Sequence, residues 1–221
     1  MLPTPRIYQR SEHSVSRQQI SEGALKVLYR LNRAGYKAFL VGGAVRDILL
    51  EREPKDFDIA TDAHPEEIRD LFRNSRLIGR RFRLAHVRFG REVIEVATFR
   101  AGHEGNEDGA SIADTGRILR DNVYGDIDDD VWRRDFMVNA LYYNISDFSI
   151  VDYVGGVEDI RQRQLRLIGD PALRYREDPV RMLRAIRFAT KLELHIDDAT
   201  REAFNRYGDL LNGIAPARLF D

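Results

Sequence analysis

The 221-residue chain contains no cysteine and no apolar run long enough to cross a membrane. The missing cysteines exclude disulfides and thiolate metal sites. The first nineteen residues, 1–19, are polar and show no apolar core of a signal peptide. These absences favour a cytoplasmic protein with no membrane segment.

An excess of one charge is also missing, because the formal net charge is −1. The net charge therefore gives no support for a nucleic-acid partner, but the charged residues are unevenly distributed along the chain. Arginine greatly outnumbers lysine, and one stretch holds Arg69, Arg73, Arg76, Arg80, Arg81, Arg83, Arg88 and Arg91. Guanidinium groups suit phosphate. The cluster is either the electrostatic footprint of a nucleic-acid binder or a solvated surface with internal ion pairs.

The periodicity of apolar residues predicts an α/β (α+β) fold with a mixed sheet. Helices are predicted over 20–34, 44–51, 65–73 and 131–143, and from 179 to the end. Strands are predicted over 37–41, 56–60, 84–89, 92–99 and 150–153. Residues 1–17 predict a disordered tail, 101–117 a long mobile loop, 18–156 a sheet-containing head and 157–221 a helical region.

The stretch Leu40-Val41-Gly42-Gly43-Ala44-Val45-Arg46-Asp47 joins an apolar strand to a helix through two glycines. Glycines let backbone N–H groups approach a phosphate, and a helix start favours negative charge. Asp56 and Asp58 follow, and within a strand they project to one face. A cation such as Mg²⁺ relieves the repulsion between two such carboxylates. An acid pair alone is common on surface strands, but beside this turn it predicts phosphoryl or nucleotidyl transfer.

Three further acidic or basic sites leave alternatives open. Glu95 stands in an apolar strand, so it lies at an exposed edge, pairs with an arginine or joins the metal site. Asp135 opens a predicted helix, either as its cap or facing the metal-bound substrate. Arg134 beside it is either a surface residue or a bidentate ligand of a triphosphate.

The fourth segment begins with Asp178-Pro179, a strong helix start. Arg181 and Arg184 are three residues apart and therefore neighbours on the helix surface. With Asp178 they can read a nucleobase edge, since a guanidinium donates to base acceptors and a carboxylate accepts from an exocyclic amine. The alternative is an ordinary amphipathic helix with solvated arginines.

Taken together, these segments resemble the class II poly(A) polymerase and CCA-adding nucleotidyltransferase family, and most closely its bacterial poly(A) polymerases. The resemblance runs from about residue 36 to residue 220. It is carried by Leu40-Val41-Gly42-Gly43 with Val45-Arg46-Asp47, Asp56-Phe57-Asp58, Arg133-Arg134-Asp135-Phe136 with Asn139-Ala140-Leu141, and Glu177-Asp178 with Arg181, Arg184, Arg187 and Phe188. One departure is Met137, where the family usually has threonine.

The resemblance implies a polymerase-β-like palm head followed by a helical neck and body. It implies template-independent addition of AMP from ATP to RNA 3′ ends, with two Mg²⁺ ions; no particular protein partner is indicated. The implied roles are catalysis for Asp56, Asp58 and Asp135, metal binding for Asp56 and Asp58 with Glu95 as a further candidate, and nucleotide binding for Gly42, Gly43, Arg46, Arg134, Asp178, Arg181 and Arg184.

Other functions remain open at this stage. The nearest is CCA addition to tRNA, which shares every catalytic motif. A non-catalytic RNA-binding module and a nucleotidyltransferase acting on a small molecule or protein are less favoured, because the acid pair and the arginine surface are both present. Since the family continues with helical parts that grip RNA, we also expect the chain to be a fragment lacking them.

Overall fold

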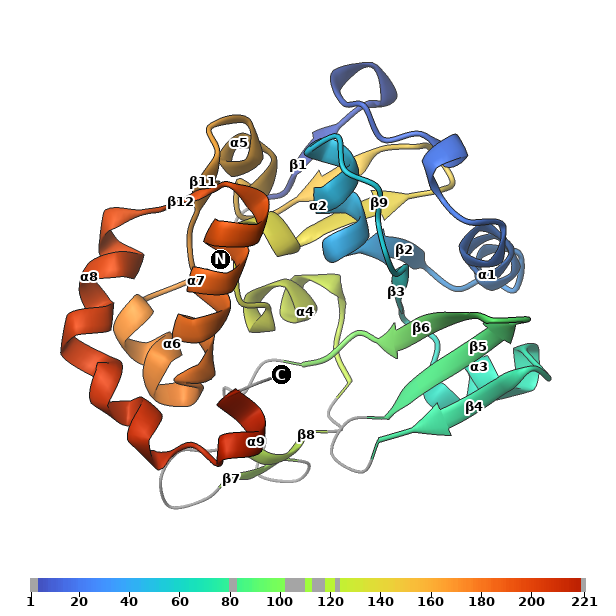
Figure 1. Cartoon of the computed structure of the whole chain (residues 1–221). Helices are drawn as coiled ribbons and strands as arrows, with labels where there is room; N and C mark the ends of the chain where they lie inside the picture. The colour runs from blue at the N-terminus through green and yellow to red at the C-terminus, as the bar shows by residue number, and fades with distance from the viewer. Residues whose placement is uncertain (1–3, 80–82, 102–109, 113–117, 122–123, 220–221) are drawn as a thin grey trace.

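A computed structural model describes residues 4–79, 83–101, 110–112, 118–121 and 124–219 (Figure 1). Its centre is an eight-stranded mixed sheet with the order β1-β10-β9-β2-β3-β6-β5-β4. The strands are β1 Arg6–Tyr8, β2 Ala38–Val41, β3 Asp58–Thr61, β4 Ser75–Ile78, β5 Leu84–Phe89, β6 Glu92–Thr98, β9 Leu141–Asn144 and β10 Ile150–Asp152. Within this sheet β3 and β6 run parallel, and the other described pairs are antiparallel.

Helices cover the sheet and extend beyond it. They are α1 Glu22–Arg33, α2 Gly43–Leu49, α3 Pro65–Leu71, α4 Ile127–Arg133, α5 Gly156–Arg161, α6 Pro171–Glu177, α7 Val180–Leu192, α8 Asp198–Tyr207 and α9 Pro216–Leu219, with 3-10 turns η1 Arg10–Glu12, η2 Arg17–Gln19, η3 Met137–Asn139 and η4 Gly208–Gly213. Two small ladders pair β7 Ala110–Ile112 with β8 Ile118–Asp121, and β11 Gln164–Leu165 with β12 His195–Ile196. Among the described helices none is long and apolar enough to span a bilayer.

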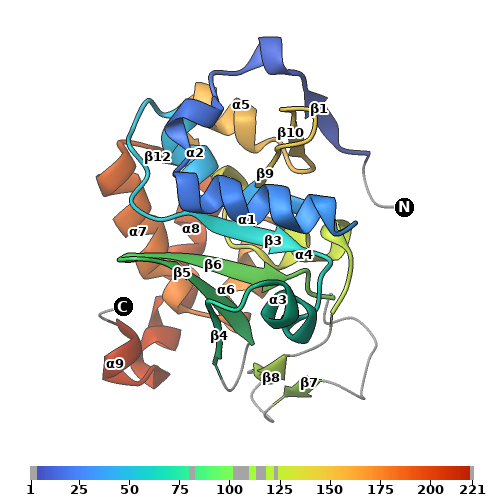
Figure 2. The same cartoon turned by 90° about the vertical axis from the view of Figure 1, so that its right-hand side faces the viewer.

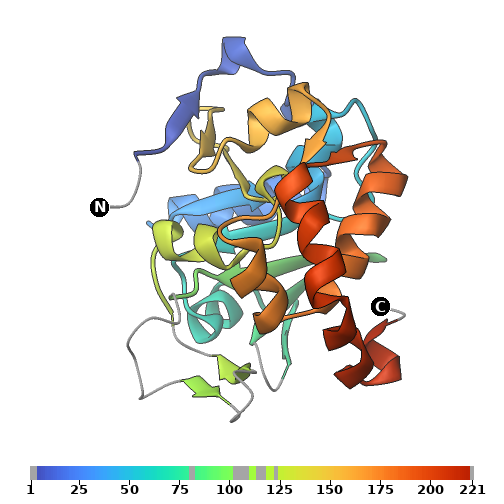
Figure 3. The same ribbon diagram turned by 90° about the vertical axis from the view of Figure 1, so that its left-hand side faces the viewer.

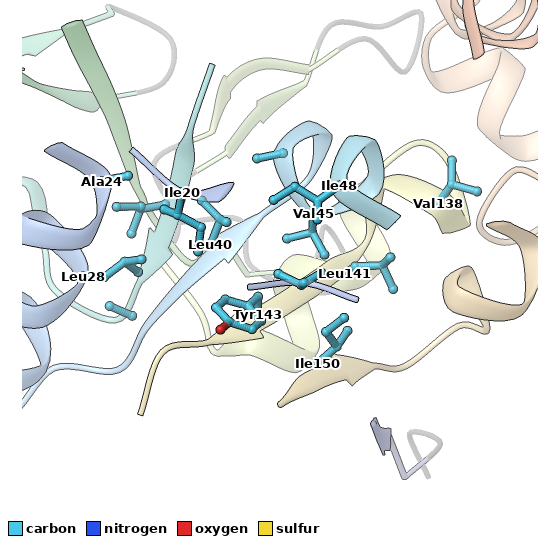
Figure 4. Packing of buried hydrophobic residues seen from close by; sticks show 14 of the residues in the cluster. Ile20, Ala24, Leu28, Leu40, Val45, Ile48, Val138, Leu141, Tyr143 and Ile150 are labelled. Carbon is cyan, nitrogen blue, oxygen red and sulfur yellow. The ribbon is translucent and has the colours of Figure 1, made fainter. Parts of the chain in front are cut away.

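Helix α1 shows how the sequence builds one face of the sheet. The Ser21 hydroxyl caps it by accepting from the Ala24 N–H at 3.1 Å. Its buried residues include Ala24, Val27, Leu28 and Leu31, which recur at helical spacing. Figure 2 shows α1 lying across β3 and β6. In Figure 4 its apolar side chains meet those of β2, α2, β9 and β10 in a shared core.

A second, smaller core lies on the opposite face of the sheet. Val41, Ala60 and Tyr142 point there from neighbouring strands, and Val131 of α4 packs against them. At the side of the sheet, α6, α7 and α8 stack as a helical layer (Figure 3). Its division from the head at residue 157 stays a prediction.

The predicted hairpin over 84–99 and the helices near 20–34, 44–51 and 65–73 are present within a few residues. The predicted disorder of residues 1–17 is wrong for the described part, residues 4–17. There β1 pairs with β10, and Tyr8 and Val15 are buried at 1% and 0% exposure. The apolar contacts of these two side chains offset the conformational entropy that is lost when the segment becomes ordered. A fully polar tail would have no such contacts.

The predicted helix over 131–143 is also wrong. Helix α4 ends at Arg133, η3 makes a single turn, and residues 141–144 form β9 between β2 and β10. Leu141, Tyr142 and Tyr143 are all buried because this strand is covered on both faces. Such a short continuous apolar run cannot be told from a buried helix by periodicity alone.

The other differences are smaller. Strand β3 begins at Asp58, so Asp56 lies in the loop before it rather than on the same strand. The helical pattern after residue 179 is interrupted by β12, and α5 and α6 were not predicted. Most of the predicted mobile loop, 102–109 and 113–117, lies outside the described residues, whereas 110–112 form β7.

Candidate active site

One register row of the sheet places the key acid among its neighbours. Asp58 on β3 pairs with Val41 of β2 on one side and with Glu95 of β6 on the other. The row continues from Val41 to Tyr142, and from Glu95 to His86 and Arg76. Paired residues of adjacent strands share a face. Within this row, Asp58 therefore lies between the apolar side chain of Val41 and a run of ionisable side chains, those of Glu95, His86 and Arg76.

A cleft of about 690 Å³ opens beside Asp58, between the sheet and α7. Its lining residues are Gly42, Gly43, Arg46, Asp56, Asp58, Arg133, Arg134, Asp135, Asn139, Asp178, Arg181, Arg184, Arg187 and Phe188. This set includes every catalytic and nucleotide-binding residue predicted from the sequence, although Glu95 is not among them. Segments far apart in the chain are thus brought to one cavity.

The glycine turn forms one wall of the cleft. Gly42 has φ 64° and ψ −126°, a conformation that side-chain-bearing residues rarely adopt, and α2 begins at Gly43. Arg46 on this helix is 5% exposed. Its guanidinium bonds the Asp47 carboxylate at 2.6 Å and the Asn139 side-chain oxygen at 2.6 Å. Arg46 therefore links α2 to η3 through a hydrogen bond, and it also lines the cleft.

The carboxylates concentrate negative charge at the neighbouring wall. Burial first, and then the nearby charge of Glu95, raises the pKa of Asp58 to about 6, although Arg134 acts against this. Asp56 is exposed in the loop before β3. Glu95 contacts His86 at 3.3 Å, so its partner is a histidine rather than an arginine. No three metal-ligating side chains cluster within the described part of the chain.

Arg134 enters the cleft from the end of α4. Its Nε donates to the Tyr142 hydroxyl at 2.7 Å, and its Nη2 donates to the Asp130 carboxylate at 2.9 Å. The pKa of Arg134 is raised: burial opposes its charge, but Tyr142 and Asp130 outweigh that effect. The guanidinium is accordingly a permanent cation in a fixed orientation.

Asp135 connects the head to the helical layer. Its Oδ1 accepts from the Phe136 N–H at 2.8 Å and from the Asn139 amide at 3.0 Å. Its Oδ2 accepts from Arg184 of α7 at 2.8 and 2.6 Å. Burial acts to raise the pKa of Asp135, but Arg184 and the other donors outweigh it and hold the pKa below its usual range. Contrary to the prediction, Asp135 does not open a helix. It lies between α4 and η3.

The three predicted base-reading residues lie on or just before α7, as the sequence indicated. Each is engaged by the protein itself: Asp178 by Arg218 at 3.0 Å, Arg181 by Glu177 at 2.8 Å, and Arg184 by Asp135. The Oδ1 of Asp178 also accepts from the Val180 N–H, which agrees with the predicted helix start. A nucleobase reaching these groups would exchange contacts with their present partners.

The cleft contains residues to which no individual role was given. Arg133, Arg187 and Phe188 line it, and their only sequence signal was their place in the family motifs. Burial, and then the neighbouring cations Arg100 and Arg174, lower the pKa of Arg133 to about 10. The arginines that line this cleft concentrate positive charge, which suits an anionic ligand.

The family model described as "Poly A polymerase head domain" matches residues 38–166, from β2 to just past β11. The chain belongs to this family. This poly(A) polymerase head-domain protein is 58% identical to Poly(A) polymerase I of Salmonella typhimurium over 99% of its length. It is 39% identical to the CCA-adding enzyme of Lactobacillus helveticus over 89% of its length.

Solved structures show the same architecture. The CTP complex of the Bacillus stearothermophilus CCA-adding enzyme superposes with a TM-score of 0.76 at 33% identity. The match covers 90% of this chain and 46% of that one. The chain likewise spans about half the length of the curated relatives it matches, 48% for the Salmonella typhimurium protein and 47% for the Lactobacillus helveticus one. The predicted family and the nucleotidyltransferase fold class are confirmed.

Proposed function

We propose that the protein is a template-independent RNA nucleotidyltransferase that adds AMP from ATP to RNA 3′ ends. The observation that carries the proposal is the single cleft in which the Gly42–Gly43 turn, the Asp56 and Asp58 carboxylates and the arginines of α7 meet. A glycine turn suits phosphate, adjacent carboxylates suit divalent cations, and guanidinium groups suit phosphate and base edges.

The acid pair fits Mg²⁺ by the chemistry of its donors. Both ligands are hard carboxylate oxygens, and the neighbouring charges of Glu95 and Asp56 add to the effect of burial in raising the pKa of Asp58. Asp56 and Asp58 would hold the metal, with Glu95 on the adjacent strand as a further candidate. Mg²⁺ held there would supply activation of the attacking hydroxyl and neutralisation of charge on the leaving pyrophosphate.

The chain's own residues supply orientation and charge. The Gly42–Gly43 backbone, Arg46 and Arg134 would hold the triphosphate. Asp135 would complete the catalytic site, and Asp178, Arg181 and Arg184 would face the base. The RNA 3′ oxygen attacks the α-phosphorus in line, the bond to pyrophosphate breaks, and the hydroxyl proton is released. Fixed arginines near the phosphates stabilise the developing charge without reorganising at the moment of reaction.

Similarity supports ATP as the nucleotide. Identity is 58% to a protein named Poly(A) polymerase I and 39% to one named CCA-adding enzyme, at coverage of 99% and 89% of this chain. The second candidate function is CCA addition to tRNA. It is favoured by the solved CTP complex of a CCA-adding enzyme, which shares this fold over most of the chain.

A primer-extension assay tests the proposal. It uses the full-length protein with Mg²⁺, a generic single-stranded RNA or a tRNA lacking CCA, and ATP alone or ATP with CTP. A long adenosine ladder on generic RNA is the expected result. Addition of a few nucleotides to tRNA that requires CTP would establish the second candidate instead. Asp58→Asn is the catalytic control, and extension by this variant at the wild-type rate would refute the assigned site.

A further inference from the structure

Two buried side chains, those of Tyr142 and Asp130, form a closed triangle of hydrogen bonds with the guanidinium of Arg134. The Tyr142 hydroxyl accepts from Arg134 Nε at 2.7 Å and donates to Asp130 Oδ2 at 2.7 Å. The same carboxylate oxygen accepts from Arg134 Nη2 at 2.9 Å. Tyr142 is 0% exposed and Asp130 is 9% exposed. Buried charge-assisted hydrogen bonds of this length fix the side chain that they hold.

The opposite edge of the same guanidinium lies at the glycine turn. A Cβ atom added to Gly42 would come within 3.5 Å of Arg134 Nη1. Nη1 donates a long hydrogen bond of 3.4 Å to the Asn139 carbonyl. The anchored edge thus faces the protein, and the Nη1 edge lies where a phosphate would approach Gly42 and Gly43.

Burial first, and then the carboxylate of Asp130, raise the pKa of Tyr142 well above its ordinary value, although Arg134 opposes this. The phenol therefore stays protonated, and its O–H donates a hydrogen bond to Asp130. Its oxygen remains an acceptor for Arg134 Nε, so the direction of every hydrogen bond in the triangle is determined.

Tyr142 also ties this triangle to the acid pair. Tyr142 on β9 and Asp58 on β3 both pair with Val41 of the intervening strand β2, and all three share a face. Strands at the centre of a sheet are held by hydrogen bonds on both sides. The anchor of Arg134 and the catalytic carboxylate therefore belong to one rigid frame.

We propose that Tyr142, together with Asp130, is a positioning residue that sets the distance between the Arg134 cation and the acid pair for a nucleoside triphosphate. The inference rests on the proposed function, because it assumes that Arg134 meets the triphosphate. Tyr142 does not touch the ligand itself; it acts through Arg134.

Tyr142→Phe is the sharpest test because it removes one oxygen and keeps the ring. The ring also lies 5.0 Å from the Arg134 guanidinium carbon, so their stacking is retained. We expect the Kd and the KM for MgATP to rise about tenfold, which is the effect of losing one charge-assisted hydrogen bond. The KM for the RNA primer should stay unchanged. Asp130→Asn should have the same selective effect.

A double-mutant cycle shows whether the effect passes through Arg134. In an Arg134→Ala background, Tyr142→Phe should cause no further loss of MgATP affinity. Tyr143→Phe is the matched control, since it removes the same oxygen from the next residue of β9, which faces the opposite core. Thermal melts confirm that each variant is folded.

The outcomes separate this inference from the proposed function. Wild-type MgATP affinity in Tyr142→Phe, or losses that add fully in the double variant, would overturn the positioning role even if the enzyme extends RNA. An equal rise in the KM values for MgATP and RNA would also overturn it, because it would indicate general loosening. A selective loss of MgATP binding in a protein that extends no RNA would support positioning and refute the transferase function.

Discussion

Arg184 of α7 grips the carboxylate of Asp135 with Nε at 2.8 Å and Nη2 at 2.6 Å. Because Asp135 stands between α4 and η3, this ion pair joins the helical layer to the head across the candidate active site. It also occupies a guanidinium that the sequence assigned to base recognition. The same arginine therefore links α7 to the head, while its role in nucleotide preference stays a prediction.

Replacing Arg184 with alanine should lower both the stability of the fold and the discrimination between nucleotides. The Asp135 carboxylate, 13% exposed, would lose its cationic partner, and we expect a loss of about 1–2 kcal/mol in the free energy of unfolding. Discrimination of ATP from CTP should fall. Urea denaturation and competition between the two nucleotides measure these effects. The exposed Lys191→Ala on the same helix is the control, and unchanged discrimination in Arg184→Ala would contradict base reading.

Asp58→Asn should lower the rate of nucleotidyl transfer by at least about a thousandfold while leaving the fold intact. The side chain is crowded by Glu95 and Asp56, so removing its charge relieves repulsion and should not lower the melting temperature. Rate measurements with saturating Mg²⁺ and a thermal melt check both statements. The exposed Glu53→Gln in the preceding loop serves as a charge-matched control.

Alanine at Gly42 and at Gly43 should act differently. Gly42 has φ 64°, so Gly42→Ala strains the backbone by about 1–3 kcal/mol, whereas its added Cβ would make only an ordinary 3.5 Å contact with Arg134 Nη1. Gly43 carries no positive φ, and an added Cβ would lie 3.5 Å from Arg46 Nη2. Gly43→Ala should therefore fold normally and bind MgATP more weakly. Equal stability of the two variants in chemical denaturation would be inconsistent with this distinction.

Asp159 should make stability depend on pH. Its side chain is 3% exposed, Oδ2 has no hydrogen-bond partner among the described residues, and burial raises its pKa to about 6 although Arg166 opposes the shift. Well below pH 4 the carboxyl is neutral in both states, and from about pH 4 the unfolded chain ionises before the folded one does. As pH rises to 6 and beyond, ionisation favours the unfolded state, at a cost on the order of 2–3 kcal/mol.

Asp159→Asn removes this titration. Its unfolding free energy relative to wild type should therefore increase between pH 4 and pH 8. Denaturation at several pH values measures the difference between the two proteins, so that other titrating groups cancel. A difference that is constant across this range would contradict the assignment.

Local patterns predicted much of the framework because they depend on nearest neighbours along the chain. The alternation over 84–89 and 92–99 and the helical spacing in α1 are enforced by burial of one face, and both elements formed as expected. The helix predicted over 131–143 was wrong for residues 134–143, because the apolar residues there suit either a buried helix or a central strand. Only the neighbours β2 and β10 decide that choice.

The sequence by itself determined the family, the glycine turn, the acid pair and the arginines of α7, because backbone freedom, charge and side-chain chemistry belong to individual residues. The tertiary structure alone decided what those side chains contact. It paired Glu95 with His86, Arg184 with Asp135, and Asp178 with Arg218. It also placed Tyr142 of β9 against Arg134 at the end of α4, because the packing of that helix on the sheet brings together groups that no sequence spacing encodes.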